Sequence, residues 1–495
     1  MDSKAQEQNW IFVAASAGTR RQSKIRHCLA LAILSACTCF VLITKYYDNW
    51  QEGLFGAAPQ NLDQFQKCSI KNFLDTGLPF LDSASPLPVA EFVERRNQLA
   101  EALVADGIDA FLVEPGYTFQ YYANISQKDW EVWEPEERPF LMVVQPQSSA
   151  QGEISAATTF LAPSFEVERA KLLGMPFEEA LAFVPWEEHW NPYETLMEAW
   201  HSNSLAGMSG QQGRAPKIMV DEEMRDFIQR GLGENGFDVI GLGGEVERVK
   251  QTKSVREIEI VRAVNTGTVE AVRAMRECMY PGLTENQVMN VLDNTLRAAG
   301  MEPFFDIVLF DEDASNPHGG TDGSKVLEAE TFVLIDVGAH LYGYSSDICR
   351  TFFPPFFPKP SSPSEYAALS VDIREKLSVW DTVLEAQNQS MEFLKAGNSA
   401  ASVDIAARKV ITDAGYGEAF THRVGHGIGI KAHESPYLNK GNLEVILRAG
   451  MTFTSEPGIY LVDKFGVRHE DILLVKDDGE PEVLSGIRAK GPWEP

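Results

Sequence analysis

The sequence predicts a mixed α/β (α+β) protein of two folded domains behind an N-terminal membrane anchor. Its 495 residues exceed what one compact core holds and suit two or three domains. An uncharged apolar run, "CLALAILSACTCFVLIT", occupies residues 28–44. From about residue 85 onward, helical and strand-like patterns alternate, which favours α/β architecture.

The apolar run is expected to be a transmembrane signal anchor. The basic "RRQSKIR" precedes it, and Lys45, Tyr46 and Tyr47 follow at an interface position. Its 17 residues are at the short end of what spans a bilayer, where about 20 are typical. A buried core helix and a cleaved signal peptide, which would release a secreted protein, are the alternatives.

This anchor predicts a single-pass type II topology. Residues 1–27 would be a cytoplasmic basic leader, 28–44 the span and 45–84 a stem, with everything beyond on the lumenal or extracellular side. The sequons at Asn124 and Asn388 are compatible with a glycoprotein on that side.

The first folded domain is predicted over residues 85–244. Helical apolar spacing covers 91–107, and short apolar runs at 108–114, 139–146 and 158–163 read as strands. No group of chemically active residues occurs in this part, so we expect a cap or a substrate-shaping domain. A long helical pattern then opens a second α/β unit over 245–480, followed by a C-terminal tail over 481–495.

Charge and cysteine content exclude some classes of function. A formal net charge of −28 argues against a nucleic-acid partner, because phosphates require Lys and Arg patches. The six cysteines form no CxxC pair, which argues against a zinc ribbon and against a disulfide scaffold.

The segment "TFVLIDVGAHLYGYSSDICRTFF" is predicted to be a β-hairpin with an aspartate on each strand. A turn centred near Leu341 and Tyr342 would place Asp336 and Asp347 roughly opposite each other. Two carboxylates at that distance repel, and one or two divalent metal ions would remove the conflict.

A second pair of acids occurs in "GMTFTSEPGIYLVDKFGVRHEDILLV", where Glu456 and Glu470 can converge. His426 lies between glycines that allow close backbone approach. Oxygen ligands with one imidazole favour Mn, Zn, Co or Fe. Regular strand alternation would place His426 and His433 on opposite faces, so both can reach one cavity only if a kink or bulge intervenes.

Four motifs in order, "DVGAHLYGYSSDICRTF", "HRVGHGIGIKAHESP", "SEPGIY" and "GVRHED", resemble the pita-bread metallopeptidases. This family includes Xaa-Pro aminopeptidases, prolidases, and their creatinase and methionine aminopeptidase relatives. The resemblance implies a pita-bread catalytic domain over 245–480 and a creatinase-type domain over 85–244.

The resemblance also implies a ligand set for two divalent metal ions, with Mn²⁺ as the first expectation and Zn²⁺, Co²⁺ or Fe²⁺ as alternatives. Asp347 and Glu470 would bridge the two ions. The implied ligands are Asp336, Asp347, His426, Glu456 and Glu470.

Other matching positions imply catalytic roles. His318 and His433 would contact substrate, Arg468 would orient a carboxylate, and Glu456 would also shuttle a proton. The implied enzyme is a homodimeric exopeptidase of the aminopeptidase P or prolidase type. It would hydrolyse small peptides with proline at the second position through a hydroxide held by two metals. His422 is expected to make a structural hydrogen bond.

The chain departs from the family pattern at Cys349, where a threonine is usual, and at Ser455 and His469. None of these removes an implied ligand. Two other functions stay open from the sequence: a non-peptidase metal-dependent hydrolase or lyase on the same scaffold, and a catalytically silent binding protein.

Overall fold

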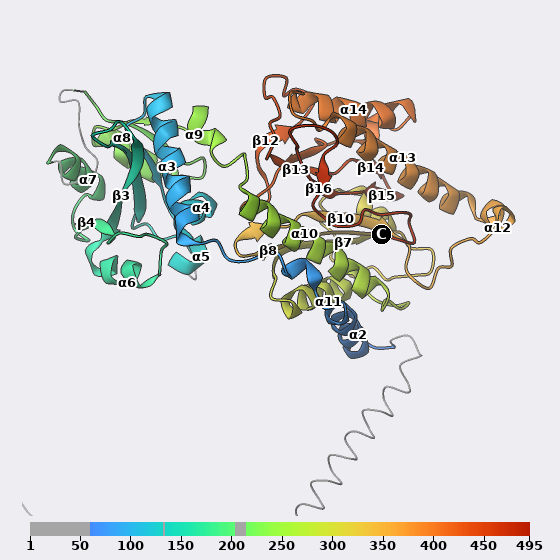
Figure 1. The fold of residues 1–495 in the computed structure, drawn as a ribbon. Helices are drawn as coiled ribbons and strands as arrows, with labels where there is room; N and C mark the ends of the chain where they lie inside the picture. The colour runs from blue at the N-terminus through green and yellow to red at the C-terminus, as the bar shows by residue number, and fades with distance from the viewer. Residues whose placement is uncertain (1–59, 132–133, 203–213) are drawn as a thin grey trace, which may run out of the picture. The chain divides into compact units, whose positions relative to one another are not determined.

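Residues 60–131, 134–202 and 214–495 are described in the computed structural model of the protein, shown in Figure 1. They confirm the mixed α/β fold. The predicted anchor at 28–44 lies outside the described residues. Within the described ranges, no helix is both long enough and apolar enough to cross a bilayer.

The N-terminal domain is built on a six-stranded sheet with strand order β4-β3-β2-β1-β5-β6. Strand β1 pairs antiparallel with β2 and parallel with β5. Helix α3 packs on one face of the sheet, and α7 and α8 pack on the other. The strands are β1 (Ala110–Val113), β2 (Leu141–Ser148), β3 (Ile154–Pro163), β4 (Ala182–Trp186), β5 (Lys217–Val220) and β6 (Asp238–Ile240).

The predicted helix over 91–107 and the three predicted strands correspond to α3 and β1 to β3. Helix α3 ends where Gly107 adopts a left-handed conformation with φ of 66°. The helices of this domain are α3 (Val89–Asp106), α4 (Tyr117–Ala123), α5 (Gln127–Trp130), α6 (Val167–Leu172), α7 (Pro192–His201), α8 (Asp226–Glu234) and α9 (Gly244–Arg248).

The long helical pattern that opens the second unit is two helices, not one. Helix α9 ends at Arg248, and α10 (Val255–Arg276) starts anew behind Ser254. The Ser254 hydroxyl accepts from the Glu257 backbone N–H, and the Glu257 carboxylate accepts from the Ser254 N–H. This capping box defines the start of α10 more strongly than helical periodicity alone could.

The first half of the C-terminal domain is an antiparallel sheet with order β10-β8-β7, covered by α10 and α11. Val333, Ile335 and Val337 of β8 face these helices within one apolar core. The residues that alternate with these along β8, including Asp336, therefore face away from the helices. The elements are α11 (Glu285–Ala298), β7 (Glu302–Phe310), β8 (Val333–Leu341), β9 (Tyr344–Ser345) and β10 (Ile348–Phe352).

The second half repeats this plan, with an antiparallel sheet of order β12-β11-β13-β16-β17 packed against α13 and α14 (Figure 1). Strands β14 and β15 form a separate hairpin. The elements are α12 (Pro363–Ala368), α13 (Val371–Phe393), α14 (Ala400–Asp413), β11 (Gly425–Gly427), β12 (Glu434–Leu438), β13 (Thr452–Ser455), β14 (Gly458–Leu461), β15 (Phe465–Arg468), β16 (Asp471–Leu474) and β17 (Glu482–Val483). Four 3₁₀ turns, at Pro79–Leu81, Ser164–Glu166, Asp311–Ser315 and Gly417–Ala419, complete the described elements.

Part of the predicted stem belongs to the C-terminal domain. Residues Leu62–Asp75 form α2, which packs against α10 and α11 through Phe65 and Phe73. A disulfide joins Cys68 of α2 to Cys278, just after α10. The cysteine pattern predicted no disulfide scaffold, and this single bridge over 210 residues of sequence was not foreseen. The residues 481–495, expected as a tail, include β17 and pack Trp493 against Phe353.

Buried polar bonds join the two domains. The Arg95 guanidinium of α3 donates to the Tyr344 hydroxyl at 2.6 Å, and that hydroxyl donates to Glu257 of α10 at 2.8 Å. Arg95 and Glu257 are each 3% exposed, so their ion pair at 3.2 Å is shielded from water. Such a pair favours one mutual placement of the helices, because breaking it would leave a buried charge uncompensated.

Candidate metal centre

The β8–β10 hairpin has its turn one residue later than predicted. Tyr342 and Gly343 form the turn with φ of 50° and 85°, the two positive angles that a tight hairpin turn requires. The register therefore pairs Asp336 with Cys349 and not with Asp347. The prediction that the two aspartates lie directly opposite is wrong, because a turn shifted by one residue shifts the pairing by two.

The two aspartates nevertheless share a face of the sheet. A pairing shift of two preserves the alternation, so Asp347 lies diagonally from Asp336 on the side away from α10 and α11. Oxygen atoms of Asp336, Asp347 and Glu470 all lie within 4.8 Å of one another. The structure thus brings together the acids of both predicted pairs.

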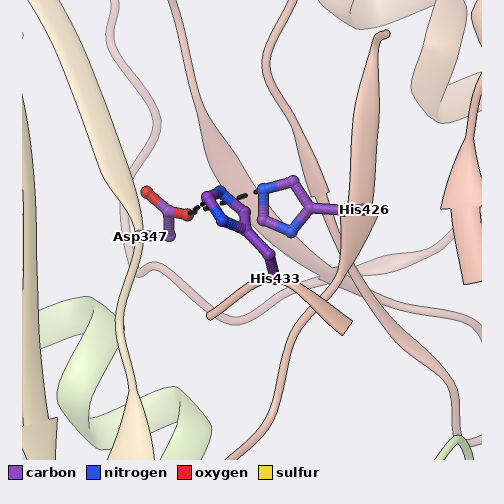
Figure 2. A group of neighbouring side chains, drawn as sticks. All are labelled: Asp347, His426 and His433. Carbon is purple, nitrogen blue, oxygen red and sulfur yellow. Dashed lines mark ion pairs between the residues drawn. The ribbon is translucent and has the colours of Figure 1, made fainter. Parts of the chain in front are cut away.

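A bulge brings His426 and His433 together, as the sequence required. The β11–β12 register shifts between His426 and Gly427, and the two imidazole rings lie 4.3 Å apart between centroids. Figure 2 shows both rings beside the Asp347 carboxylate; the distances to Oδ2 are 3.5 Å from His426 Nε2 and 3.8 Å from His433 Nε2. A Cβ on Gly425 would lie 2.1 Å from the Thr454 carbonyl oxygen, so only glycine allows this approach of β11 to β13.

The backbone fixes the tautomer of His426. Its Nδ1 lies 3.1 Å from the Gly427 carbonyl oxygen, which can only accept, so Nδ1 carries the proton. The Nε2 lone pair then faces the acids, 3.2 Å from Glu456 Oε1. A metal-ligating histidine is usually oriented by such a bond at its other nitrogen.

Glu456 and Glu470 reach the cluster from irregular positions between strands. Glu456 follows β13, with its N–H donating to the Val424 carbonyl at 2.8 Å. Glu470 lies between β15 and β16, with its N–H donating to the Cys349 carbonyl at 3.1 Å. These bonds tie both acids to neighbouring strands. Ligand atoms of His426, Glu456 and Glu470 lie within 4.8 Å of one another.

The electrostatics of the cluster call for cations. Burial raises the pKa of Asp347 and Glu470 well above their usual range, and repulsion between neighbouring carboxylates adds to it. Burial also acts to raise the pKa of Glu456, but when His426 is protonated at Nε2 as well and no metal is bound, its hydrogen bond and positive charge outweigh burial and lower that pKa to about 2.

The donor set fits divalent metal ions. Asp336 Oδ1 is buried and has no hydrogen-bond partner among the described residues. A buried acceptor of this kind is costly unless something occupies its free lone pairs. Carboxylate oxygens and one imidazole nitrogen converge here, and these are the ligands that Mn, Fe, Co and Zn accept.

Arg468 orients Asp336 and belongs to a longer chain of hydrogen bonds. Its Nη2 donates to Asp336 Oδ2 at 2.5 Å, and its Nη1 donates to the Tyr460 hydroxyl at 2.7 Å. His422 Nδ1 donates to the Arg423 carbonyl at 2.7 Å and therefore carries the proton of the neutral ring. His422 Nε2 is then an acceptor, and the Tyr460 hydroxyl donates to it at 2.8 Å. The structural role expected for His422 is confirmed. Arg468 orients Asp336 through Nη2 alone, because Nη1 donates to Tyr460 and to the Pro317 carbonyl.

The two histidines expected near substrate are both exposed. His433 is 58% exposed, and partial burial together with the neighbouring His426 lowers its pKa to about 4. His318 is also exposed, and its charge acts on the pKa values of Asp336, His422 and His433. The Arg468 guanidinium donates to the Pro317 carbonyl at 3.1 Å, which ties the His318 loop to the cluster.

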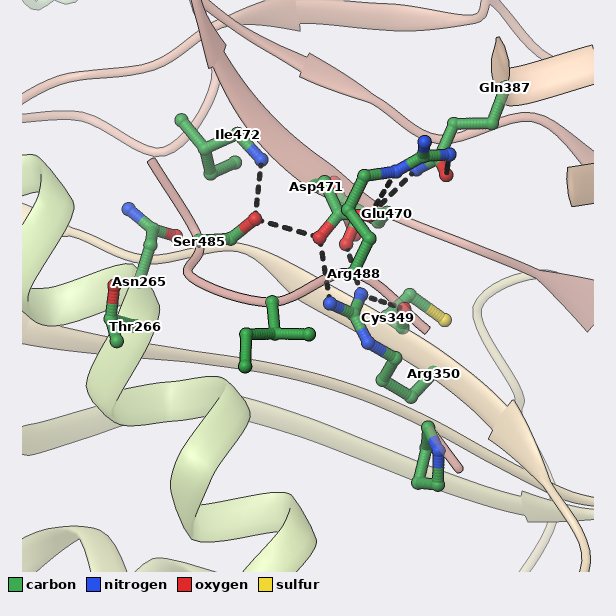
Figure 3. Close-up of polar contacts among 12 residues, drawn as sticks. Asn265, Thr266, Cys349, Arg350, Gln387, Glu470, Asp471, Ile472, Ser485 and Arg488 are labelled. Carbon is green, nitrogen blue, oxygen red and sulfur yellow. Dashed lines mark hydrogen bonds and ion pairs between the residues drawn. The ribbon is translucent and has the colours of Figure 1, made fainter. Parts of the chain in front are cut away.

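A buried ion pair behind the cluster was not predicted from the sequence. Figure 3 shows Arg350 donating to Asp471 at 2.7 Å and to the Glu470 carbonyl. Gln387 of α13 and Ser485 also donate to the Asp471 carboxylate, at 3.0 and 2.7 Å. Asp471 directly follows the implied ligand Glu470, and Arg350 lies three residues after Asp347. Only the fold shows that Arg350 and Asp471 pair with each other.

Of the three departures from the family pattern, His469 contacts Trp380 and not the ligands, whereas Cys349 pairs with Asp336 on the same face of the sheet. The His469 ring packs edge-on against Trp380 at 4.4 Å, and its Nε2 bonds the Trp380 carbonyl at 3.3 Å. Burial lowers the pKa of His469 to about 3. The Cys349 thiol is buried in a small apolar cluster with Leu334. Ser455 contacts Ser390 and, through its carbonyl, Gln387.

Comparison with known proteins identifies the family. The model of Metallopeptidase family M24 matches residues 259–477. An uncharacterized peptidase of Schizosaccharomyces pombe (strain 972) is 36% identical over 443 residues, which are 88% of this chain and 90% of that protein. The chain belongs to metallopeptidase family M24. It is therefore a peptidase of this family.

Solved structures of this family extend over both domains. Dipeptidase PepE from Mycobacterium ulcerans is similar with a TM-score of 0.67 and 25% identity, covering 81% of this chain and 98% of that one. The Xaa-Pro dipeptidase from Bacillus anthracis has a TM-score of 0.61 and 26% identity, covering 80% and 98%. The C-terminal domain is accordingly the M24 pita-bread domain, from a family that uses divalent metals.

Proposed function

We propose that this M24 peptidase hydrolyses Xaa-Pro bonds in small peptides at a centre that holds two divalent metal ions. The overlap of its ligand groups carries the proposal. Asp336, Asp347 and Glu470 surround one position, while His426, Glu456 and Glu470 surround another. Glu470 belongs to both groups, as expected of a carboxylate shared by two neighbouring ions.

The chemistry of the donors supports Mn²⁺ first, with Zn²⁺, Co²⁺ or Fe²⁺ as alternatives, because oxygen ligands dominate. Divalent cations held there would supply Lewis acidity, activating a water molecule for attack and polarising the scissile carbonyl. The protein's own part is to hold the carboxylates in place, and Arg468 does this for Asp336.

Two side chains of the cluster are suited to the remaining steps. Glu456 is held as a carboxylate and can accept a proton from the attacking water, then deliver it to the departing nitrogen. A proline nitrogen leaves as a secondary amine and needs that proton. His433 is neutral near pH 7 and half exposed at the edge of the cluster, so its N–H can stabilise the developing oxyanion.

The similar structures support a short proline-containing peptide as substrate, since they include an Xaa-Pro dipeptidase and a dipeptidase. Purified full-length protein should be assayed on Gly-Pro, on Gly-Pro-Ala and on Gly-Leu, with Mn²⁺ and with a chelator. We expect Mn²⁺-dependent release of glycine from one or both proline peptides and little from Gly-Leu. Equal inactivity on every peptide with folded, metal-loaded protein would contradict the proposal.

We also propose that the catalytic domain is lumenal or extracellular, anchored by residues 28–44 or secreted after their cleavage. The Cys68–Cys278 disulfide supports an oxidising compartment. Asn124 is exposed at the end of α4 and suits glycosylation better than Asn388, which lies within α13. The mass of the mature protein, before and after deglycosylation, tests both points. Sedimentation tests the homodimer that the family resemblance implies.

A further inference from the structure

A cleft between the two domains lies apart from the site proposed for hydrolysis. Its volume is about 1040 Å³, and none of its lining residues belongs to the metal cluster. One wall comes from the N-terminal domain, including Glu114, Tyr117 and Asp221, and the other from the tip of the β8–β9 hairpin, including His340. The cleft is therefore distinct from the metal cluster.

The cleft opens at the carboxyl ends of two parallel strands. Glu114 follows β1 and Asp221 follows β5, and β1 pairs parallel with β5. Open α/β sheets place their ligands beyond the carboxyl ends of such strands, where the chain leaves the sheet and side chains can converge. The location favours a binding site.

Asp221 is a buried carboxylate with no counter-ion among the described residues. It is 5% exposed and lines the cleft. Its Oδ2 accepts one bond, from the Glu223 N–H at 3.3 Å, while Oδ1 has no hydrogen-bond partner among the described residues. Burying an acceptor in this state is unfavourable unless a donor from outside the chain completes it.

The neighbouring charges are already paired. Arg225, a partly exposed cation nearby in sequence, donates to both oxygens of Glu114 from its N–H and its Nε. Glu223 pairs with Lys431 at 2.6 Å. These pairs leave Asp221 as the uncompensated buried carboxylate of the cleft among the described residues.

Aromatic rings from both walls lie near each other. His340 stacks on Phe304 at 4.2 Å between centroids, and Tyr117 lies 6.2 Å from His340. Burial lowers the pKa of His340, so the ring is neutral near pH 7 and does not repel a cation. Its Nε2 is buried and unpartnered among the described residues. A planar cation can stack on such rings while bonding a carboxylate.

We propose that this cleft binds an organic cation of the guanidinium class, such as an arginine side chain, through Asp221 and the rings of Tyr117 and His340. A metal ion fits less well, because the metal-ligand groups found among the described residues all lie in the catalytic cluster. A guanidinium supplies several N–H donors in one plane, which matches one free carboxylate oxygen beside aromatic faces.

The test uses N-acetyl-arginine amide, which has no free α-amine and is no exopeptidase substrate, and its uncharged isostere N-acetyl-citrulline amide. Binding to the full-length protein is measured by saturation-transfer NMR and calorimetry. We expect saturable binding of the arginine compound and at least about tenfold weaker binding of the citrulline compound. Asp221→Asn should weaken the arginine compound by about tenfold or more. The control variant Glu101→Gln, at an exposed acid of α3, should bind as the wild type does.

A second variant keeps the test decisive if Asp221→Asn does not fold. Tyr117→Leu should weaken binding of the arginine compound about threefold, because a ring face is lost. Binding should persist in Asp347→Ala, since the cleft and the metal cluster share no residue. Any of three results would overturn the proposal. The two compounds could bind equally well, folded Asp221→Asn could bind the arginine compound as tightly as the wild type does, or the wild type could fail to bind the arginine compound.

Discussion

Replacing Arg350 with methionine should reduce both stability and metal affinity. Arg350 and Asp471 are each 1% exposed and lie 2.7 Å apart. Removing one partner of a buried ion pair costs about 3–5 kcal/mol. Asp471 would keep its bonds from Ser485 and Gln387, so we expect the lower end, about 3 kcal/mol. The bond from Arg350 to the Glu470 carbonyl would also be lost, and metal affinity should fall about 10- to 100-fold.

Urea unfolding at pH 7 measures the first effect, and titration of the apoprotein with Mn²⁺ measures the second. Lys409→Met is the control, because Lys409 and Asp413 form a surface pair that is 71% and 65% exposed. Its free energy of unfolding should change by less than about 0.5 kcal/mol.

The pH dependence provides a second check. Burial alone would raise the pKa of Asp471, but Arg350 and the hydrogen bond from Ser485 outweigh it and lower the value. A carboxylate with a lowered pKa stabilises the fold above its unfolded pKa of about 3.9. This contribution is lost as the pH falls through the folded value, so the gap between wild type and Arg350→Met should narrow in acid. A variant within 1 kcal/mol of wild type at pH 7, with unchanged Mn²⁺ affinity, would refute the reasoning.

Three further predictions concern the cluster and the disulfide. Asp347→Ala should lose bound metal and turnover together, measured by elemental analysis and peptide assay; retention of both would contradict its place in the ligand set. His433→Ala should lower kcat about 10²- to 10³-fold while keeping the metal, whereas loss of metal would make His433 a ligand. Cys278→Ser should lower the free energy of unfolding by about 2–5 kcal/mol in urea, and reductant should then have no further effect. An unchanged unfolding midpoint would show that the bridge does not stabilise the fold.

The residues of the candidate site could be predicted because each lies in a local pattern. Asp336 and Asp347 flank a turn, and Glu456 directly precedes Pro457. The need for a bulge near His426 followed from strand alternation, and the structure has it between His426 and Gly427.

The detailed register could not be predicted from the same segment. Both Leu341–Tyr342 and Tyr342–Gly343 are compatible with the hydrophobic pattern, and the pattern does not say which pair turns. Gly343 decides it, because it takes a φ of 85° without cost. A pairing shift of two residues keeps the same side chains on the same face of the sheet. Asp336 and Asp347 therefore share a face, as predicted, although they do not lie directly opposite each other.

By itself the sequence determined the class of fold, the residue types of the candidate metal centre and the hairpin that carries Asp336 and Asp347, because periodicity and turn chemistry are local properties. Only the tertiary structure decided that a disulfide links α2 to the C-terminal domain, that Arg350 pairs with Asp471, and that Asp221 lines the interdomain cleft with no ion pair among the described residues. These contacts join residues that are from 121 to 210 positions apart or lie on different domains. Pairing at that range depends on how whole elements pack, and no local pattern of residues encodes it.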